Sequence, residues 1–323
     1  MTEWLTAQQE PDLDRAAQLL QQGKLVAVPT ETVYGLAADA SNPAAVRAIF
    51  AAKGRPADHP LIVHLAAAAE MTAWAKDIPP AAYQLAAAFW PGPLTLLLPK
   101  ADHVNSVVTG GLDSIGLRVS AHPVLAQILR KGQLAVAAPS ANPYKKLSPT
   151  SATQVFETLQ GKIDAVMDGG DCSFGLESTI VSLLDGEIQI LRAGPISQAE
   201  IAAVLQQPVL MPKRHQVKVS GNVDAHYQPN TQLQCLALAQ ISEIIETTQL
   251  KLAVLHYSNL PHLPSVSWQR QLSAEPLHYA HALYRELYQA DAQQVDLILL
   301  ELPPDEDAWL AIHDRLARAT TKS

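Results

Sequence analysis

Apolar runs of strand length recur through the N-terminal part of the chain. The runs are LVAVP (25–29), LIVHL (61–65), LTLLLP (94–99), IGLRV (115–119), LAVAAP (134–139) and STIVSLL (178–184). A continuous apolar run of about four to eight residues is typical of a buried strand. The pattern therefore predicts a multi-stranded sheet, in which 178–184 and 187–192 form an antiparallel hairpin.

Helical periodicity fills the stretches between these runs. It is clearest over 43–53, where Val46, Ile49 and Phe50 recur at helical spacing. Asn42 can cap this helix, and Pro43 suits its first position. Further helices are expected over 14–22 with a glycine cap at 23, and over 67–76, 80–89, 122–131 and 150–159. Strands interleaved with helices predict an α/β fold with a mixed sheet.

The periodic pattern stops from Gln206 to Leu233, a segment rich in Pro, Gly, Asn and basic residues that predicts a linker. Beyond the linker, apolar runs at 251–257 and 295–302 alternate with helical patterns near 276–292 and 305–319. This alternation predicts a second, small α/β domain. We therefore expect a first domain over 1–205, a linker over 206–233 and a C-terminal domain over 234–323.

Composition narrows the class of protein. With 323 residues, 48% of them apolar, the chain is long enough for two hydrophobic cores. The formal net charge is −8, from 23 basic and 31 acidic side chains, which argues against a nucleic-acid binder held by bulk electrostatics. A local basic groove stays open as an alternative.

The N-terminal sequence MTEWLTAQQEPDLDR has neither the basic end nor the apolar stretch of a signal peptide, and no apolar run is long enough to span a bilayer. We therefore expect a cytoplasmic protein without membrane contact. Cys172 and Cys235 lie far apart without ligand spacing, which predicts two plain thiols rather than a disulfide or a zinc site.

The chain has no GxxxxGK[ST] loop and no GxGxxG after a strand, so a bound nucleotide would depend on side chains and isolated helix ends. Lys53 and Arg55 flank Gly54 at the end of a predicted helix, and Pro56 prevents the helix from continuing. These cations can bind an anion, or they can simply cap the helix dipole. This motif alone favours neither interpretation.

Three polar clusters lie next to predicted strands: PTETVYG (29–35), PSAN (139–142) and SFGLEST (173–179). The first two directly follow apolar runs, where α/β sheets commonly bind ligands, although ordinary turn chemistry explains them as well. The third can equally be a glycine-rich hairpin connection. His64, inside an apolar run, is more typical of a core histidine than of a ligand-binding one.

Taken together, the motifs PTETVYG, KGRPADHPLIVH, FWPGPLTLLL, SIGLRVSAHP, PSAN, GLEST and LRAG resemble, in this order, the YrdC-like family of threonylcarbamoyl-AMP synthases. The resemblance covers about 15–205. The HYQP motif (226–229) and the tail AIHDRLARA (311–319) resemble the long, two-domain form. The implied fold is a twisted mixed sheet with surrounding helices and a large, positively lined cavity, followed by a small Rossmann-like domain.

The resemblance implies a nucleotidyltransferase that joins L-threonine, bicarbonate and ATP into L-threonylcarbamoyl-AMP and releases pyrophosphate, with magnesium accompanying the ATP. Downstream threonylcarbamoyl-transferase proteins would then modify the adenosine beside the anticodon of tRNAs that read codons beginning with A. Whether tRNA makes a weak contact with this chain stays open.

Residue by residue, the family's threonine-binding positions match Thr32, His64, Arg118 and Ser178. Lys53 and Arg55 match catalytic positions. The positions on the nucleotide side match Lys53, Arg55, His59, Ser114, Ala138, Ser140, Asn142, Ser148 and Arg192. The linker of the long form is expected over the cavity, with His226 or Tyr227 against the nucleotide, although Ala225 here occupies the place of a cation in the family pattern.

Two other functions stay open at this point. One is an RNA-binding or ribosome-associated YrdC-like module without synthase activity. The other is a carbamoyl-transferring relative of the kind found in a hydrogenase-maturation enzyme. The latter is disfavoured because that enzyme carries acylphosphatase-like and zinc-finger segments with paired cysteines, which this sequence lacks.

Overall fold

The computed structural model describes the chain apart from residues 185, 213–216, 222–224 and 322–323, so parts of the expected linker lie outside the described residues. The chain forms two compact units. The first unit comprises Met1–Tyr144, Pro149–Ser173 and Glu177–Asn222, and the second comprises Lys145–Ser148, Phe174–Leu176 and Val223–Ser323. Two short segments of the N-terminal sequence thus group with the second unit, which the sequence pattern did not indicate.

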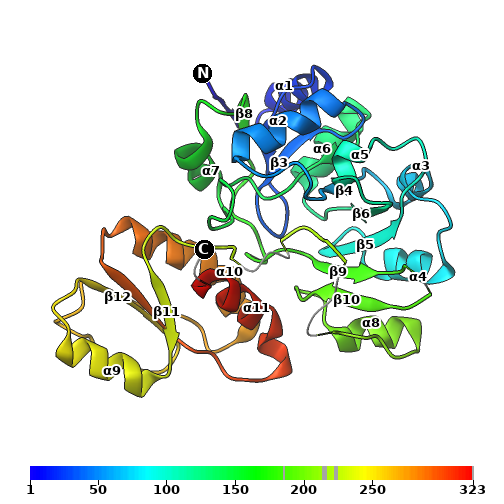
Figure 1. Ribbon diagram of the computed structural model, residues 1–323. Helices are drawn as coiled ribbons and strands as arrows, with labels where there is room; N and C mark the ends of the chain where they lie inside the picture. Colours follow the sequence, from blue (N-terminus) through cyan, green and yellow to red (C-terminus); the bar gives the residue numbers. More distant parts are fainter. Residues whose placement is uncertain (185, 213–216, 222–224, 322–323) are drawn as a thin grey trace. The chain divides into compact units, whose positions relative to one another are not determined.

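The first unit is built on one large mixed sheet (Figure 1). Its strands are β1 (Glu3–Thr6), β2 (Val26–Val28), β3 (Gly35–Asp39), β4 (Ile62–His64), β5 (Leu94–Pro99), β6 (Ser114–Arg118), β7 (Val136–Ala137), β8 (Ala165–Asp168), β9 (Thr179–Ser182) and β10 (Gln189–Arg192). Their order is β1-β8-β2-β3-β7-β4-β6-β5-β9-β10. The sheet contains parallel pairs such as β4 with β6 and antiparallel pairs such as β5 with β6, which confirms the mixed sheet.

Each of the six predicted apolar runs overlaps a strand, and β9 pairs antiparallel with β10 as expected. The sequence pattern missed β1, β3 and β8. These strands carry no extended apolar run that would mark them. Pairing with distant segments holds them in the sheet: β1 pairs with β8, and β3 pairs with β7 as well as with the neighbouring β2.

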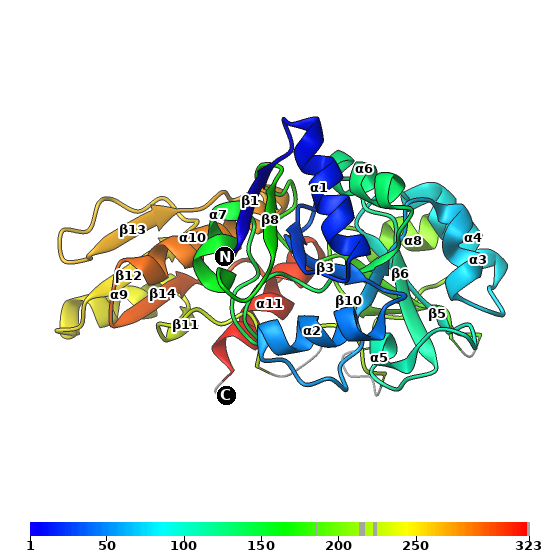
Figure 2. The ribbon, with the colours of Figure 1, turned by 90° about the horizontal axis from the view of Figure 1, so that it is seen from above.

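Helices surround this sheet (Figure 2). They are α1 (Glu10–Gln21), α2 (Pro43–Lys53), α3 (Met71–Trp74), α4 (Pro80–Phe89), α5 (Ser106–Thr109), α6 (Pro123–Gly132), α7 (Ala152–Leu159) and α8 (Gln198–Leu205), with a 3-10 turn over Ala68–Glu70. Asn42 caps α2 as predicted, since its side chain accepts from the backbone of Ala44 and Ala45. Helix α1 begins at Glu10 rather than at residue 14, because a proline in its first turn and acidic residues there favour an earlier start.

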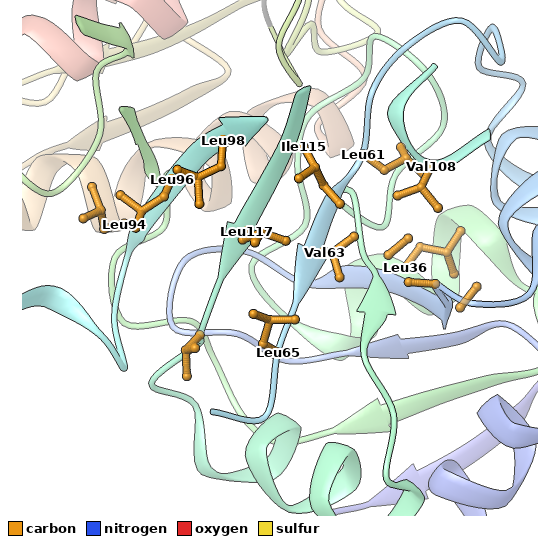
Figure 3. Packing of buried hydrophobic residues seen from close by; sticks show 14 of the residues in the cluster. Leu36, Leu61, Val63, Leu65, Leu94, Leu96, Leu98, Val108, Ile115 and Leu117 are labelled. Atoms are coloured by element: carbon orange, nitrogen blue, oxygen red, sulfur yellow. The ribbon is translucent and has the colours of Figure 1, made fainter. Parts of the chain in front are cut away.

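The two faces of the central strands carry different residues. On one face, Leu94, Leu96 and Leu98 of β5 and Ile115 and Leu117 of β6 pack into the main hydrophobic core (Figure 3). Successive side chains of a strand point to opposite faces. The intervening residues, among them polar side chains on β5 and β6, therefore project from the other face.

The second unit contains a four-stranded parallel sheet in the order β11-β14-β12-β13. Its strands are β11 (Leu233–Leu236), β12 (Leu252–His256), β13 (Trp268–Gln271) and β14 (Leu297–Glu301). Its helices are α9 (Leu238–Thr247), α10 (Pro276–Ala292) and α11 (Leu310–Thr320), with a 3-10 turn over Asp307–Trp309. A small parallel sheet with crossover helices confirms the Rossmann-like expectation. Among the described residues, no helix combines the length and the apolarity that crossing a membrane requires.

Candidate active site

Arg118, the last residue of β6, is buried in the polar face of the sheet. Its Nη2 forms an ion pair with Glu31 Oε1 at 2.7 Å, and its Nη1 donates to Thr32 Oγ1 at 3.0 Å. Its Nε donates to the carbonyl of Gly92 at 3.2 Å. Three partners therefore fix the orientation of the guanidinium plane, whose fork of donors matches the geometry of a carboxylate.

Glu31 is the acidic partner in this arrangement, and it is 5% exposed. Its second oxygen accepts a hydrogen bond from the hydroxyl of Ser120. Burial works to raise the pKa of Glu31, but the charge of Arg118 and the Ser120 hydrogen bond outweigh it and lower that pKa to about 2. Glu31 is therefore ionised at neutral pH.

His64, the last residue of β4, lies directly opposite Arg118 in the parallel pair of β4 and β6. Its side chain is buried, and neither ring nitrogen has a hydrogen-bonding partner among the described residues. Burial and then the charge of Arg118 lower the pKa of His64 to about 3, so the ring is neutral. A neutral imidazole offers one donor and one acceptor.

Ser178 precedes β9 and completes the expected threonine side. Its hydroxyl lies 2.8 Å from the hydroxyl of Thr95 on β5. Arg192, at the end of β10, donates from Nη2 to Ser178 Oγ at 2.9 Å and from Nε to the Ser178 carbonyl at 3.0 Å. The structure thus joins Arg192, expected on the nucleotide side, directly to a residue expected on the threonine side.

Lys53 ends helix α2 and is buried against the turn that follows β7. Its Nζ donates to the carbonyls of Ser140 and Asn142, at 2.5 Å each. In return, the Lys53 carbonyl accepts from the backbone of Tyr144 at 2.8 Å. Burial, and after it the charge of Arg55, lower the pKa of Lys53 well below its ordinary value. Lys53, at the end of α2, and the PSAN segment (139–142) therefore lie together.

Arg55 and His59 continue this group. Arg55 is buried, and its Nη2 donates to the carbonyl of Pro60 at 3.1 Å. The ring of His59 lies edge-on to that of Tyr144 with centroids 5.6 Å apart, and burial and then Arg55 lower its pKa. Gly54 between the two cations adopts φ +64°, the left-handed conformation that ends α2 and turns the chain toward this group.

Strand register places Ser114, His64, Arg118 and the turn after Ala138 relative to one another. Ser114 and Arg118 share a face of β6, because they are four residues apart and side chains alternate. Strand β7 runs antiparallel to β4, with Val63 opposite Ala137, so the residues that follow Ala138 lie near the start of β4. His64 lies at its end. The expected nucleotide and threonine groups therefore lie toward opposite ends of this short strand.

The described part of the linker that belongs to the first unit contributes to the same surface. Val219 packs with Ile62, Leu97 and Ile180, which project from the polar face of the sheet. The carbonyl of Ser220 accepts from Arg192 Nη1 at 2.9 Å. Residues after 205 thus help to hold Arg192 in place.

Ser148, His226 and Tyr227 belong to the second unit. The ring of Tyr227 stacks on that of Tyr284 with centroids 5.7 Å apart, and the Arg315 guanidinium lies 5.4 Å from its centroid. The backbone N–H of His226 donates to the carbonyl of Arg318 at 3.2 Å. These contacts fix the His-Tyr pair within the second unit, and its role as a nucleotide contact stays a prediction, as does that of Ser148.

Two family models match this chain. A model of the Sua5, YciO and YrdC proteins, described as "Telomere recombination", matches residues 18–194, and "Threonylcarbamoyl-AMP synthase, C-terminal domain" matches residues 196–321. The chain belongs to the threonylcarbamoyl-AMP synthase family. The resemblance inferred from the ordered motifs is thereby confirmed.

Similar members of this family extend over nearly the whole chain. Threonylcarbamoyl-AMP synthase of Pyrococcus abyssi is 36% identical, covering 94% of this chain and 93% of the relative. The Bacillus subtilis enzyme is 37% identical, covering 96% and 93%. The crystal structure of P. abyssi Sua5 complexed with L-threonine has a TM-score of 0.91 at 35% identity and covers 99% of this chain and 97% of that one. The expected fold is thus confirmed.

The structure shows two residues at the site to which the sequence analysis assigned no role. Glu31 lies within the PTETVYG motif and Ser120 within SIGLRVSAHP, but neither had been given a role. A carboxylate between threonine hydroxyls after a buried strand was the available signal for Glu31. Only the ion pair with Arg118, across the sheet, reveals what that carboxylate contacts.

Proposed function

We propose that this chain synthesises L-threonylcarbamoyl-AMP from L-threonine, bicarbonate and ATP, with release of pyrophosphate, as a nucleotidyltransferase. The observation that carries the proposal is the buried Arg118 guanidinium, whose orientation is fixed by its contacts with Gly92, Thr32 and Glu31. Relatives similar over nearly the full chain bear the name of this activity. One relative was crystallised with L-threonine.

On the threonine side, Arg118 would bind the substrate carboxylate through its planar fork. Thr32 and Ser178 would offer hydroxyl groups, and His64 would offer its donor and acceptor to the remaining polar groups of the amino acid. Because these side chains are already buried and oriented, little conformational freedom is lost when the substrate binds.

On the nucleotide side, Lys53 and Arg55 would neutralise the phosphates. The supporting groups would be His59, Ser114, Ala138, Ser140, Asn142, Ser148 and Arg192, with His226 or Tyr227. The threonine amine would attack bicarbonate, and the carbamate oxygen would then attack the α-phosphorus as pyrophosphate leaves. Such chemistry depends on positioning and on compensation of negative charge, and it needs no protein nucleophile.

Magnesium is expected to accompany the ATP. Among the described residues, no group of three or more His, Cys, Asp and Glu side chains is arranged to hold a metal ion. The carboxylate of Glu31 is engaged with Arg118 and Ser120. The ligands of the ion would therefore come mainly from the nucleotide phosphates and water, as is usual for magnesium with ATP.

The product would pass to threonylcarbamoyl-transferase proteins that modify the adenosine beside the anticodon in tRNAs reading codons that begin with A. We place this activity in the cytoplasm. We do not include a contact with tRNA in the proposed function, because the net charge of −8 gives no bulk attraction for a polyanion. Binding of tRNA is instead measured in the experiment below.

The decisive experiment is mass-spectrometric detection of threonylcarbamoyl-AMP from the purified protein with ATP, L-threonine and bicarbonate, together with pyrophosphate release. Product and pyrophosphate should both require all three substrates. Hydrolysis of ATP that is independent of threonine would contradict the proposal. So would salt-sensitive binding of tRNA in a gel shift by a protein that forms no product.

A further inference from the structure

The ion pair between Glu31 and Arg118 creates a problem for the binding of an amino acid. Arg118 uses Nη2 for Glu31, Nη1 for Thr32 and Nε for Gly92. A guanidinium has five N–H donors in all. A substrate carboxylate that engages the remaining donors brings a second negative charge close to Glu31, inside a buried site.

Two close carboxylates disfavour the ionised form of each other, and burial acts in the same direction. The charge of Arg118 lowers the pKa of Glu31. A substrate carboxylate that also binds the guanidinium compensates part of that charge, so the pKa of Glu31 rises. The same substrate also carries an α-ammonium group on the carbon next to its carboxylate. That group can remove the conflict by giving up a proton.

We propose that Glu31 is the proton acceptor for the α-ammonium group of the substrate amino acid. This role rests on the function proposed above and adds a catalytic residue to it. The Glu31 carboxylate takes one proton from the ammonium, whose N–H electron pair remains on nitrogen, and this gives a neutral amine and a neutral carboxylic acid. The amine nitrogen then bonds to the bicarbonate carbon, and the displaced hydroxide leaves as water with a second proton from nitrogen.

Other titratable groups near Glu31 fit this role. Arg118 on β6 and His64 on β4 face it, as do His122, just before α6, and Cys172, which follows β8. His64 and His122 have lowered pKa values, for which burial is the main cause, and burial raises the pKa of the Cys172 thiol. At neutral pH these three groups are therefore uncharged, which leaves Glu31 as the ionised acceptor beside Arg118.

The first experiment uses wild-type protein and isothermal titration calorimetry, in buffers of different ionisation enthalpy at neutral pH. The probes are L-threonine and 3-hydroxybutanoate, which keeps the carboxylate and hydroxyl but lacks the amine. Binding of 3-hydroxybutanoate should take up about one proton, because Glu31 must become protonated beside a second carboxylate. L-Threonine should take up none, because it supplies that proton itself. Equal proton uptake by both ligands, or uptake by neither, would overturn the proposal.

The second experiment compares Glu31→Gln with wild type and with Glu10→Gln, a matched exchange at an exposed helix start. For Glu31→Gln, the kcat of product formation should fall about 10²–10³-fold at pH 7 and recover partly at higher pH, where solution supplies the free amine. The variant should also bind 3-hydroxybutanoate more tightly than wild type does. Glu10→Gln should match wild type in each measurement.

A parallel loss of affinity for both ligands in Glu31→Gln, with an unchanged pH profile, would show that Glu31 only orients Arg118 and would refute its role as acceptor. If wild-type protein forms no threonylcarbamoyl-AMP, the proposed function fails. In that case the two calorimetric comparisons still decide whether Glu31 accepts the proton of a bound amino acid.

Discussion

Arg192 holds Ser178 through two hydrogen bonds, one to its hydroxyl at 2.9 Å and one to its carbonyl at 3.0 Å. The resemblance to the family had assigned Arg192 to the nucleotide and Ser178 to threonine. In the folded protein the two residues form one unit at the adjoining ends of β9 and β10. A change in one should therefore affect the binding of both substrates.

Arg192→Lys removes the planar fork while it keeps the charge. We expect KM to rise for both L-threonine and ATP, each by about tenfold, because a lost hydrogen bond to a charged group costs about 1.5 kcal/mol or more. Steady-state kinetics of pyrophosphate release will measure this effect. Arg130→Lys, an exchange at an exposed position of α6, is the control. A rise confined to the KM of ATP would show that the two subsites are not coupled through Arg192.

Lys53→Ala should affect both stability and activity. The substitution leaves the carbonyls of Ser140 and Asn142 without the ammonium that they now accept from, and an unsatisfied buried group costs about 1–3 kcal/mol. Denaturant unfolding should show this loss, and synthesis of threonylcarbamoyl-AMP should be abolished. Lys24→Ala, at an exposed residue, should change neither. Full activity of Lys53→Ala would remove this lysine from the proposed chemistry.

The Glu31–Arg118 ion pair should make the free energy of unfolding depend on pH in the acidic range. The pKa of Glu31 is about 2 in the folded protein and 4.5 for an ordinary glutamate, so the ionised carboxylate favours folding. This contribution, of about 3 kcal/mol, is complete above pH 4.5 and is lost as the pH falls toward 2. The difference in unfolding free energy between wild type and Glu31→Gln should therefore shrink across this range. A difference that stays constant from pH 6 to pH 3 would contradict this assignment.

His64→Leu should separate binding from stability. The neutral, buried imidazole has no partner among the described residues, so a leucine of similar size should not lower the midpoint of thermal unfolding. Affinity for L-threonine should nevertheless fall at least tenfold, because the ligand loses a hydrogen-bonding partner in a buried site. Calorimetry and differential scanning fluorimetry will test the two effects. A loss of stability without a loss of affinity would identify His64 as a core residue only.

Local sequence accounted for much of the fold. Helix α2 has the predicted bounds because its cap, its first proline and its terminal glycine are all encoded within a dozen neighbouring residues. The six apolar runs form strands because a short continuous run of apolar residues is itself a local signal for a buried strand. Strands β1, β3 and β8 escaped prediction because they carry no extended apolar run, and their partners in the sheet supply the stabilisation that their own sequence lacks.

For the candidate site, the sequence determined which residue types are present and in which motifs they lie. It indicated Lys53, Arg55, Ser140 and Asn142 as one group, and the structure brings Lys53 to the other motif through two carbonyls. The sequence could not say that Glu31 neutralises Arg118, because these residues are far apart in the chain and meet only through the strand order.

The sequence by itself determined the α/β character, because periodicity, caps and turn residues act over a few neighbouring positions, and its motifs in their fixed order carried the resemblance to the family. Only the tertiary structure decided the partners of Arg118, the contact of Arg192 with Ser178 and the stacking of Tyr227 on Tyr284. The physical reason is that pairing register and burial join distant segments. These long-range contacts also set the electrostatic environment, and with it the charge state of Glu31 and His64.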